Sequence, residues 1–480
     1  MSKISYDLLE EQELLLGMVS EVIAQDSYDA KEWNRLGDLI SSTCSDSDIA
    51  FEASLNTFSQ LIRKLLIERG KTIEKTFYRS PSSTENRFLP SGSPLDHAYE
   101  RSIPALEVEK KLKKRLEQIV GWETESIATS SAMGALHLVL STLCHILRPT
   151  SNRPLRLVSA GKYFETSKLL DFFDNELFST LEVDSIRELG LMDKESVPDI
   201  LLLEPIVYGH SLSVLNLEDL INSWKQLGCC PRYIIIDTTL SGPGWNTRFF
   251  LELLSNINGN PILIEYRSGL KLDQSGLEIA NLGIIDIFSI KSSTIQKLDA
   301  VSLGKTLRAL RGILGLGLRA SDLASLDAPF LLSPKWSKIH AARVFRNNKL
   351  VAEELGKCTG LVSSVSHPST AEAKGNAPFV IISLENESLQ YHGYLLAALR
   401  EEIYSTNLQV VHGSSFGFRN TRFESIVPNN SDDVGIFKIA AGAVLGPSLA
   451  TLLHIMRKLS KGGIEGIRKN YPQIKPLQLP

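Results

Sequence analysis

Hydrophobic residues recur at helical spacing through the first part of the chain. The apolar positions that share a helical face are Leu8, Leu9, Leu14, Leu15 and Met18, followed by Leu55, Phe58, Leu61, Leu65 and Ile67. This spacing predicts helices that pack on the main body of the protein or on a second subunit. Residues 78–97 are polar and rich in proline and serine, which predicts a loop.

Apolar runs alternate with helical patterns between residues 98 and 332. The predicted strands are Leu155–Ser159, Ile200–Glu204, Tyr233–Thr238, Ile262–Tyr266 and Ile284–Ile290. Several of these runs are continuously apolar, as is typical of parallel strands that are covered on both faces. We therefore expect an α/β domain with a mostly parallel, doubly wound sheet, in which ligands bind beyond the carboxyl ends of the strands.

The pattern changes again after residue 332. Helices are predicted at 335–355, 391–404 and 445–459, and strands at 379–385, 408–415 and 435–442. This mixture indicates a small α+β domain. The expected organisation is a helical N-terminal extension and arm (1–97), a large domain (98–332) and a small C-terminal domain (333–480).

Composition and charge set limits on the class of protein. The chain has 480 residues, of which 43% are hydrophobic and 22% charged, as in an ordinary globular protein. A formal net charge of −4 suggests neither nucleic acid nor an anionic membrane as a partner. The N-terminal sequence has no signal-peptide pattern, and no apolar run reaches membrane-spanning length. The five cysteines form no zinc-binding pattern, so we expect no metal site and a cytoplasmic location with reduced thiols.

Two ionisable residues stand at the ends of predicted strands. Asp237 ends one apolar run, and Lys271 follows the next. A pyridoxal phosphate (PLP) site needs such a pair, because a lysine amine forms a Schiff base with the cofactor aldehyde and a carboxylate keeps the ring nitrogen protonated. The pair alone is weak evidence, since many lysines follow strands.

Nearby residues suit the rest of such a cofactor. The segment Thr129–Gly134 precedes a helical run, and a helix N-terminus with small residues binds anions such as phosphate. A plain serine N-cap explains it equally well. Ser268 could contribute a hydroxyl to the same phosphate, although loop serines are common. The ring of Tyr163 could stack on a flat cofactor, although a packing role is more usual.

Taken in order, these segments resemble the Cys/Met-metabolism family of PLP enzymes, the cystathionine γ-synthase and methionine γ-lyase group of fold type I. The segments that resemble the family's motifs are Tyr99–Arg101, Val108–Leu112, Ser130–Ala135, Tyr163–Thr166, Ile236–Thr239, Ser268–Lys271, Ser414–Gly417 and Ile436–Gly442. The resemblance runs from about residue 97 to the C-terminus. It implies PLP fold type I, the aspartate-aminotransferase-like fold.

The resemblance also implies roles for individual residues. Lys271 would carry the cofactor and act as general base at the substrate Cα, and Tyr163 would stack on the ring and handle protons with it. Asp237 would hold the ring nitrogen. The other implied cofactor-binding residues are Ser131, Ala132, Met133, Ser268, Thr239, Tyr99 and Arg101. The last two would reach in from a neighbouring subunit, which implies a homodimer or homotetramer with a shared active site.

The chain also departs from the family pattern around the substrate. Lys438 stands where the family has the arginine that binds the substrate carboxylate, and lysine offers a point charge instead of a fork. Arg419 or Arg422 could take over that role, although a solvated loop arginine is the commoner explanation. Tyr208 could replace an asparagine that contacts the cofactor. Ser415, in the segment Ser414–Gly417, is a further candidate for substrate binding.

The resemblance implies a lyase or transferase that acts on an amino acid by β/γ-elimination or γ-replacement. S-adenosylmethionine or an O-acylhomoserine would each suit as donor of the γ-leaving group. An aminotransferase or decarboxylase on the same fold is an alternative, and so is a catalytically degenerate scaffold or regulatory homologue. The sequence Gly315–Ala320 fits a dinucleotide fingerprint, but it follows a helical pattern instead of a strand, which argues against a nucleotide site.

Overall fold

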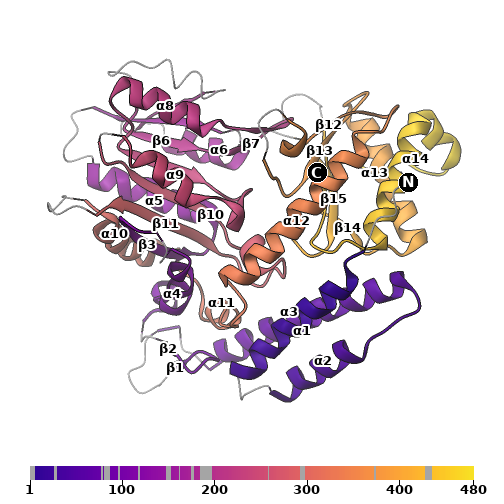
Figure 1. Ribbon diagram of the computed structural model, residues 1–480, viewed down its shortest axis with the longest axis horizontal. Coiled ribbons are helices and arrows are strands. Elements are labelled where there is room, and N and C mark those ends of the chain that lie inside the picture. The colour runs from indigo at the N-terminus through magenta and orange to yellow at the C-terminus, as the bar shows by residue number, and fades with distance from the viewer. Residues whose placement is uncertain are drawn as a thin grey trace.

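The computed structural model describes residues 6–25, 30–76, 79–80, 87–95, 98–116, 119–147, 153–161, 163–173, 178–183, 197–257, 259–291, 298–371, 375–427 and 435–479. The two larger β-sheets lie side by side, with the long helix α12 (Pro334–Leu355) running from one toward the other and three N-terminal helices along the lower edge of Figure 1. Within this described part of the chain, no helix is long and apolar enough to cross a membrane.

The N-terminal segment is helical, as predicted. It forms α1 (Leu8–Gln25), α2 (Ala30–Ser42) and α3 (Asp48–Glu74). Leu15 and Met18 are buried, but Leu9 is 70% exposed, so its assignment to the buried face was wrong. The buried stripe of α1 passes through Leu8, and the next residue of a helix is turned by about 100°, which carries Leu9 away from it.

The N-terminal helices pack tightly on the main body. Helix α3 contacts α11 (Ala320–Ser325) where Gly70 faces Ser321. A Cβ at Gly70 would lie 2.4 Å from the Ser321 carbonyl oxygen, so glycine is what allows the two helices to approach this closely. Apolar side chains of α1, α2 and α3 share one core with α11 and Trp336.

The larger sheet has seven strands in the order β3-β11-β10-β9-β6-β4-β5. Their bounds are β3 (Trp122–Thr129), β11 (Gly283–Ile290), β10 (Ile262–Ser268), β9 (Tyr233–Asp237), β6 (Ile200–Leu203), β4 (Leu155–Ala160) and β5 (Phe178–Glu182). Strand β11 runs antiparallel to both of its neighbours, β3 and β10, and the other neighbouring pairs are parallel. The five predicted strands are all present, whereas β3 and β5 were not predicted.

Helices cover both faces of this sheet (Figure 1). Helices α5 (Ala132–Leu147) and α10 (Ala300–Leu314) pack on the face that includes Ile235. Helices α8 (Leu217–Leu227) and α9 (Thr247–Leu254) pack on the opposite face, with Ile234 and Ile236. Successive residues of β9 thus enter two different cores, which explains why its sequence is continuously apolar.

The smaller sheet has five strands in the order β12-β13-β16-β15-β14. Its strands and helices are β12 (Val362–Ser366), β13 (Val380–Leu384), β16 (Ile436–Ala440), β15 (Thr421–Ile426), β14 (Val410–His412), α13 (Leu389–Thr406) and α14 (Pro447–Asn470). All neighbouring pairs are antiparallel except β14 with β15. Strands β12 and β15 were not predicted from the sequence. Arg422 lies on β15 and not in a loop.

Short elements join the larger ones. Between the N-terminal helices and the large sheet lie β1 (Arg87–Phe88), β2 (Pro94–Leu95), the 3-10 turn η1 (Glu100–Ser102) and α4 (Leu106–Lys114). The predicted loop at 78–97 thus contains a two-stranded hairpin, and part of that stretch lies outside the described residues. Nearer the site are α6 (Phe164–Phe173), β7 (Ile206–Tyr208), β8 (Leu212–Val214) and the 3-10 turns η3 (Gly242–Gly244), η4 (Leu272–Gln274) and η5 (Pro368–Thr370).

Candidate active site

Lys271 and Asp237 lie at the carboxyl ends of adjacent parallel strands. Asp237 is the last residue of β9 and is in register with Tyr266 of β10, and Lys271 follows the end of β10 by three residues. Both side chains line one cavity of about 220 Å³. Among the described residues, those that line the cavity are Ser131, Ala132, Met133, Tyr163, Glu165, Glu204, Ile206, Tyr208, Asp237, Thr239, Leu240, Ser268, Lys271 and Phe416.

The environment of Lys271 favours its neutral form. Loss of solvent lowers the pKa of Lys271 to about 8, and the positive charge of Lys438 acts in the same direction. The carboxylate of Asp237 opposes this shift. The Lys271 amine also lies 4.2 Å from the centre of the Phe416 ring. A large fraction of the amine is therefore unprotonated near pH 8 and able to act as nucleophile or base.

Asp237 is held by a loop hydrogen bond. Burial raises the pKa of its carboxyl, against the opposing effect of hydrogen bonding from Thr239. The Thr239 backbone N–H donates to Asp237 Oδ1 at 2.8 Å. A cationic group placed beside this buried carboxyl would stabilise its ionised form, because an opposite charge lowers the pKa of an acid.

Hydroxyl groups and a helix N-terminus meet at one end of the cavity. Ser131 caps α5, and its Oγ accepts a hydrogen bond from the Gly134 N–H at 3.0 Å. The Ser268 backbone N–H donates to Thr239 Oγ1 at 3.1 Å, so this hydroxyl and Ser268 lie together. Three hydroxyls beside the N-terminus of a 16-residue helix can hold an anionic group such as a phosphate.

Tyrosine rings form part of the wall. The Tyr163 backbone N–H donates to Glu204 Oε1 at 3.1 Å, which fixes the start of α6. Burial raises the pKa of the Tyr163 phenol, and the nearby carboxylate of Glu165 raises it further. Burial likewise raises the pKa of Tyr208. Both phenols therefore hold their protons at neutral pH.

Two of the predicted substrate-binding cations, Lys438 and Arg419, lie outside the lining of the cavity and are ion-paired. Lys438, on β16, forms a buried ion pair with Glu424, and its Nζ is 5.8 Å from the centre of the Tyr208 ring. Arg419 forms a buried ion pair with Glu11. The sequence did not predict either ion pair, because the acidic partners lie on other elements, Glu424 on β15 and Glu11 on α1.

The remaining predicted residues are also absent from the lining of the cavity. Arg422 Nη2 is 3.1 Å from Glu278 Oε2, and its Nη1 donates to the Ser414 carbonyl at 3.0 Å. Ser415 directly precedes Phe416 and has a positive φ of 75°, but it does not line the cavity itself. In this single chain Tyr99 and Arg101 also lie away from the cavity. The ring of Tyr99 is 52% exposed, with the Arg101 guanidinium 5.3 Å from its centre.

Five lining residues were not predicted as site residues: Glu165, Glu204, Ile206, Leu240 and Phe416. Glu165 and Phe416 fall inside segments that resemble family motifs, Tyr163–Thr166 and Ser414–Gly417, so a signal for both was present in the sequence. The side chain of Glu204 packs against Gly161, where an added Cβ would lie 2.6 Å from Glu204 Oε1. Only glycine lets the two segments meet there.

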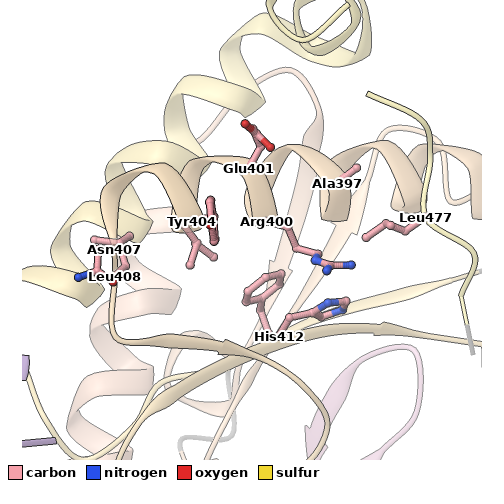
Figure 2. A pocket seen from close by; sticks show the side chains of 10 residues that line it. Ala397, Arg400, Glu401, Tyr404, Asn407, Leu408, His412 and Leu477 are labelled. Atoms are coloured by element: carbon pink, nitrogen blue, oxygen red, sulfur yellow. The ribbon is translucent and has the colours of Figure 1, made fainter. Parts of the chain in front are cut away.

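Another hollow lies far from Lys271. It measures about 800 Å³ and is lined by residues of α13, β14 and the C-terminal segment, including Arg400, Tyr404, His412 and Leu477. Figure 2 shows its side chains spread along α13 above the strands. It contains none of the residues predicted for the site. Among the described residues, no group of three or more His, Cys, Asp or Glu side chains is placed to hold a metal ion.

Solved structures with the same architecture include a cystathionine γ-lyase, a methionine γ-lyase and an O-acetylhomoserine sulfhydrylase. Cystathionine γ-lyase from yeast has 15% identity and a TM-score of 0.54, over 85% of this chain and 98% of that one. A methionine γ-lyase from Micromonospora echinospora has 15% identity and a TM-score of 0.52, over 82% and 98%. An O-acetylhomoserine sulfhydrylase from Wolinella succinogenes has 15% identity and a TM-score of 0.50, over 74% and 96%.

The chain has PLP fold type I. The fold predicted from the sequence is thereby confirmed, including the mostly parallel sheet of the large domain. In fold type I terms, the cavity lies at the carboxyl ends of the central strands β9 and β10. No protein-family model matches the sequence, and no curated protein matches it. At 15% identity the likeness establishes the fold, and function has to be argued from the site.

Proposed function

We propose that the protein is a PLP-dependent enzyme that acts on the amino group of an amino-acid substrate and catalyses β/γ-elimination or γ-replacement. One observation carries the proposal: Lys271 and Asp237 line the same cavity, which also contains the N-terminus of α5. The shared fold with two γ-lyases and a sulfhydrylase supports the reaction class. The proposed type of enzyme is therefore a lyase or transferase of the cystathionine γ-synthase kind.

The residues present fit this cofactor. When bound, PLP supplies an electron sink for a negative charge that develops at the substrate Cα. Lys271 would hold the cofactor aldehyde, and Asp237 the ring nitrogen. Ser131, Thr239 and Ser268 would bind the phosphate together with backbone groups at Ala132 and Met133. All seven residues line the cavity.

Protons in this cavity would be moved by the chain's own groups. Lys271, with a pKa of about 8, exchanges a proton readily near neutral pH and would take it from the substrate Cα. Tyr163 keeps its proton at the same pH and would donate a hydrogen bond to a substrate or cofactor oxygen. Leu240, Ile206 and Phe416 would exclude water from the same space.

The substrate end of the site is proposed on geometry alone. Tyr208 lines the cavity and Lys438 lies behind it, so both are placed to influence a bound amino acid. Ser415 adjoins the cavity through Phe416. Arg419 and Arg422 could act only after separating from Glu11 and Glu278. Either S-adenosylmethionine or an O-acylhomoserine remains a suitable donor of the γ-leaving group.

We also propose that the active form is a homodimer or homotetramer. Tyr99 lies exposed beside Arg101, outside the cavity of its own chain. In an oligomer this pair would be available to the cavity of a neighbouring subunit, where the guanidinium would meet the phosphate. Arginine suits that role because its fork matches phosphate oxygens in a bidentate manner.

The test is an absorbance spectrum of the purified protein with and without PLP. The parent protein should acquire a visible band that borohydride bleaches, and Lys271→Ala should lack it. Lys111→Ala is a matched control, because burial also lowers the pKa of Lys111 to about 8 although it lies outside the cavity. A band in Lys271→Ala, or no band in the parent, would refute the proposal.

A further inference from the structure

The cavity around Lys271 is richer in acidic than in basic groups. Glu165, Glu204 and Asp237 line it, whereas Lys271 is the only lysine or arginine among the described lining residues. Lys271 and Asp237 interact with one another electrostatically. Glu204 is buried and accepts the Tyr163 backbone N–H. Glu165 is exposed at the edge of the cavity and close enough to Tyr163 to raise the pKa of its phenol.

The three predicted substrate-binding cations do not offset this excess. Lys438 is paired with Glu424 behind Tyr208, so the two charges compensate each other. Arg419 and Arg422 are each paired with a different acid. A substrate carboxylate would meet no uncommitted cation among these three groups. A positively charged substrate group, by contrast, would find the carboxylate of Glu165 at the edge.

We infer that the cavity selects amino-acid substrates whose side chain carries a positive charge, such as an ammonium or sulfonium group, with Glu165 as the specificity-determining residue. The inference rests on the function proposed above and narrows its substrate class. Because Glu165 is solvent-exposed, its attraction is of the moderate size of a surface ion pair and weakens with salt.

L-Ornithine and L-norleucine are suitable probes. Their side chains have the same length and differ in a terminal ammonium or methyl group. Titration calorimetry of the PLP-loaded protein should give at least about fivefold tighter binding of ornithine, equivalent to about 1 kcal/mol. The ratio of the affinity for ornithine to the affinity for norleucine should fall when the ionic strength is raised from a low value to about 0.5 M. Equal affinities, or tighter binding of norleucine, would overturn the inference.

Two variants test whether Glu165 causes the preference for ornithine. Glu165→Gln should bring the ornithine-to-norleucine ratio to within about twofold, because it removes the charge but keeps the size of the side chain. Glu252→Gln, which removes an exposed acid on α9 outside the cavity, should keep the ratio of the parent. An unchanged ratio in Glu165→Gln would also refute the assignment. If the protein takes up PLP but shows no preference, the inference alone fails; if it takes up no PLP, the proposed function fails with it.

Discussion

Glu11 and Arg419 form a buried ion pair across 408 positions of the chain. Their exposed fractions are 1% and 5%. Arg343 Nη1 also donates to Glu11, at 2.5 Å, so one carboxylate of α1 binds two arginines. Arg419 lies three residues after Phe416, which forms part of the cavity wall. Helix α1 therefore helps to hold the segment that closes the site, although it lies outside the PLP-binding domain predicted from the sequence.

Replacing Glu11 should destabilise the protein strongly. Glu11→Gln leaves two buried guanidinium groups without their shared carboxylate, and breaking a buried ion pair in this way costs about 3–5 kcal/mol. Urea unfolding at pH 7 would measure the loss. Glu13→Gln, on the exposed side of the same helix, should change the free energy of unfolding by less than about 0.5 kcal/mol.

The effect of Glu11 should also depend on pH. The two arginines hold the pKa of Glu11 below its ordinary value of 4.5, in spite of its burial. A carboxyl with a depressed pKa stabilises the fold above its pKa in the unfolded chain, and this contribution is lost as the pH falls through the folded-state pKa. The difference between parent and Glu11→Gln should therefore shrink below about pH 4.5. A difference that stays constant to pH 3 would contradict the assignment.

Glu265 is expected to behave in the opposite way. It is 2% exposed on β10, and burial raises the pKa of its carboxyl to about 7. Ionising it therefore costs free energy in the folded state, so stability is lost as the pH rises from about 4.5 to about 7. Trp245 Nε1 donates to Glu265 Oε1 at 2.6 Å, and Thr247 Oγ1 donates to Oε2 at 2.9 Å.

Glu265→Gln should stabilise the protein at high pH. Glutamine can accept the hydrogen bond from Trp245 and donate one to Thr247 without becoming charged. Relative to the parent, the variant should gain about 3–4 kcal/mol at pH 8 and close to nothing at pH 4.5, at about 1.4 kcal/mol per pKa unit. Urea unfolding at the two pH values is the measurement. An equal effect of the substitution at both would show that hydrogen bonding, not charge, dominates at this position.

Strand β9, which ends at Asp237, and strand β10, which precedes Lys271, were predictable because both of their faces are buried. Their continuous apolar runs leave little doubt about the element, and a lysine or aspartate directly after such a run is conspicuous. Strand β3 was missed because Glu123 and Glu125 interrupt its pattern. The charge of the buried Glu125 is compensated by Lys113, whose Nζ lies 2.8 Å from Glu125 Oε1. That partner comes from another element, which local pattern does not reveal.

The parts of the site that escaped prediction depend on tertiary structure. Phe416 reaches the cavity from the small-sheet region, and Lys271 is on the large-sheet side. Arg419 and Lys438 were reasonable candidates for a carboxylate site because arginine and lysine bind carboxylates. Their pairing with Glu11 and Glu424 could not be foreseen, because nothing in the sequence indicates which distant acid a cation will meet.

The uptake of PLP should follow the protonation of Lys271. Only the neutral amine attacks an aldehyde, and the pKa of Lys271 is lowered to about 8, so the rate of uptake should rise with pH and reach its midpoint near 8. The charge of Asp237 raises this pKa. Asp237→Asn should therefore move the midpoint to lower pH, and Asp38→Asn, an exposed acid on α2, should leave it in place. Stopped-flow absorbance between pH 6 and 10 gives these midpoints. A midpoint near 10.5 in the parent would show that the amine is solvated as in free lysine, and a shift to higher pH in Asp237→Asn would show that the carboxylate does not act on the amine through its charge.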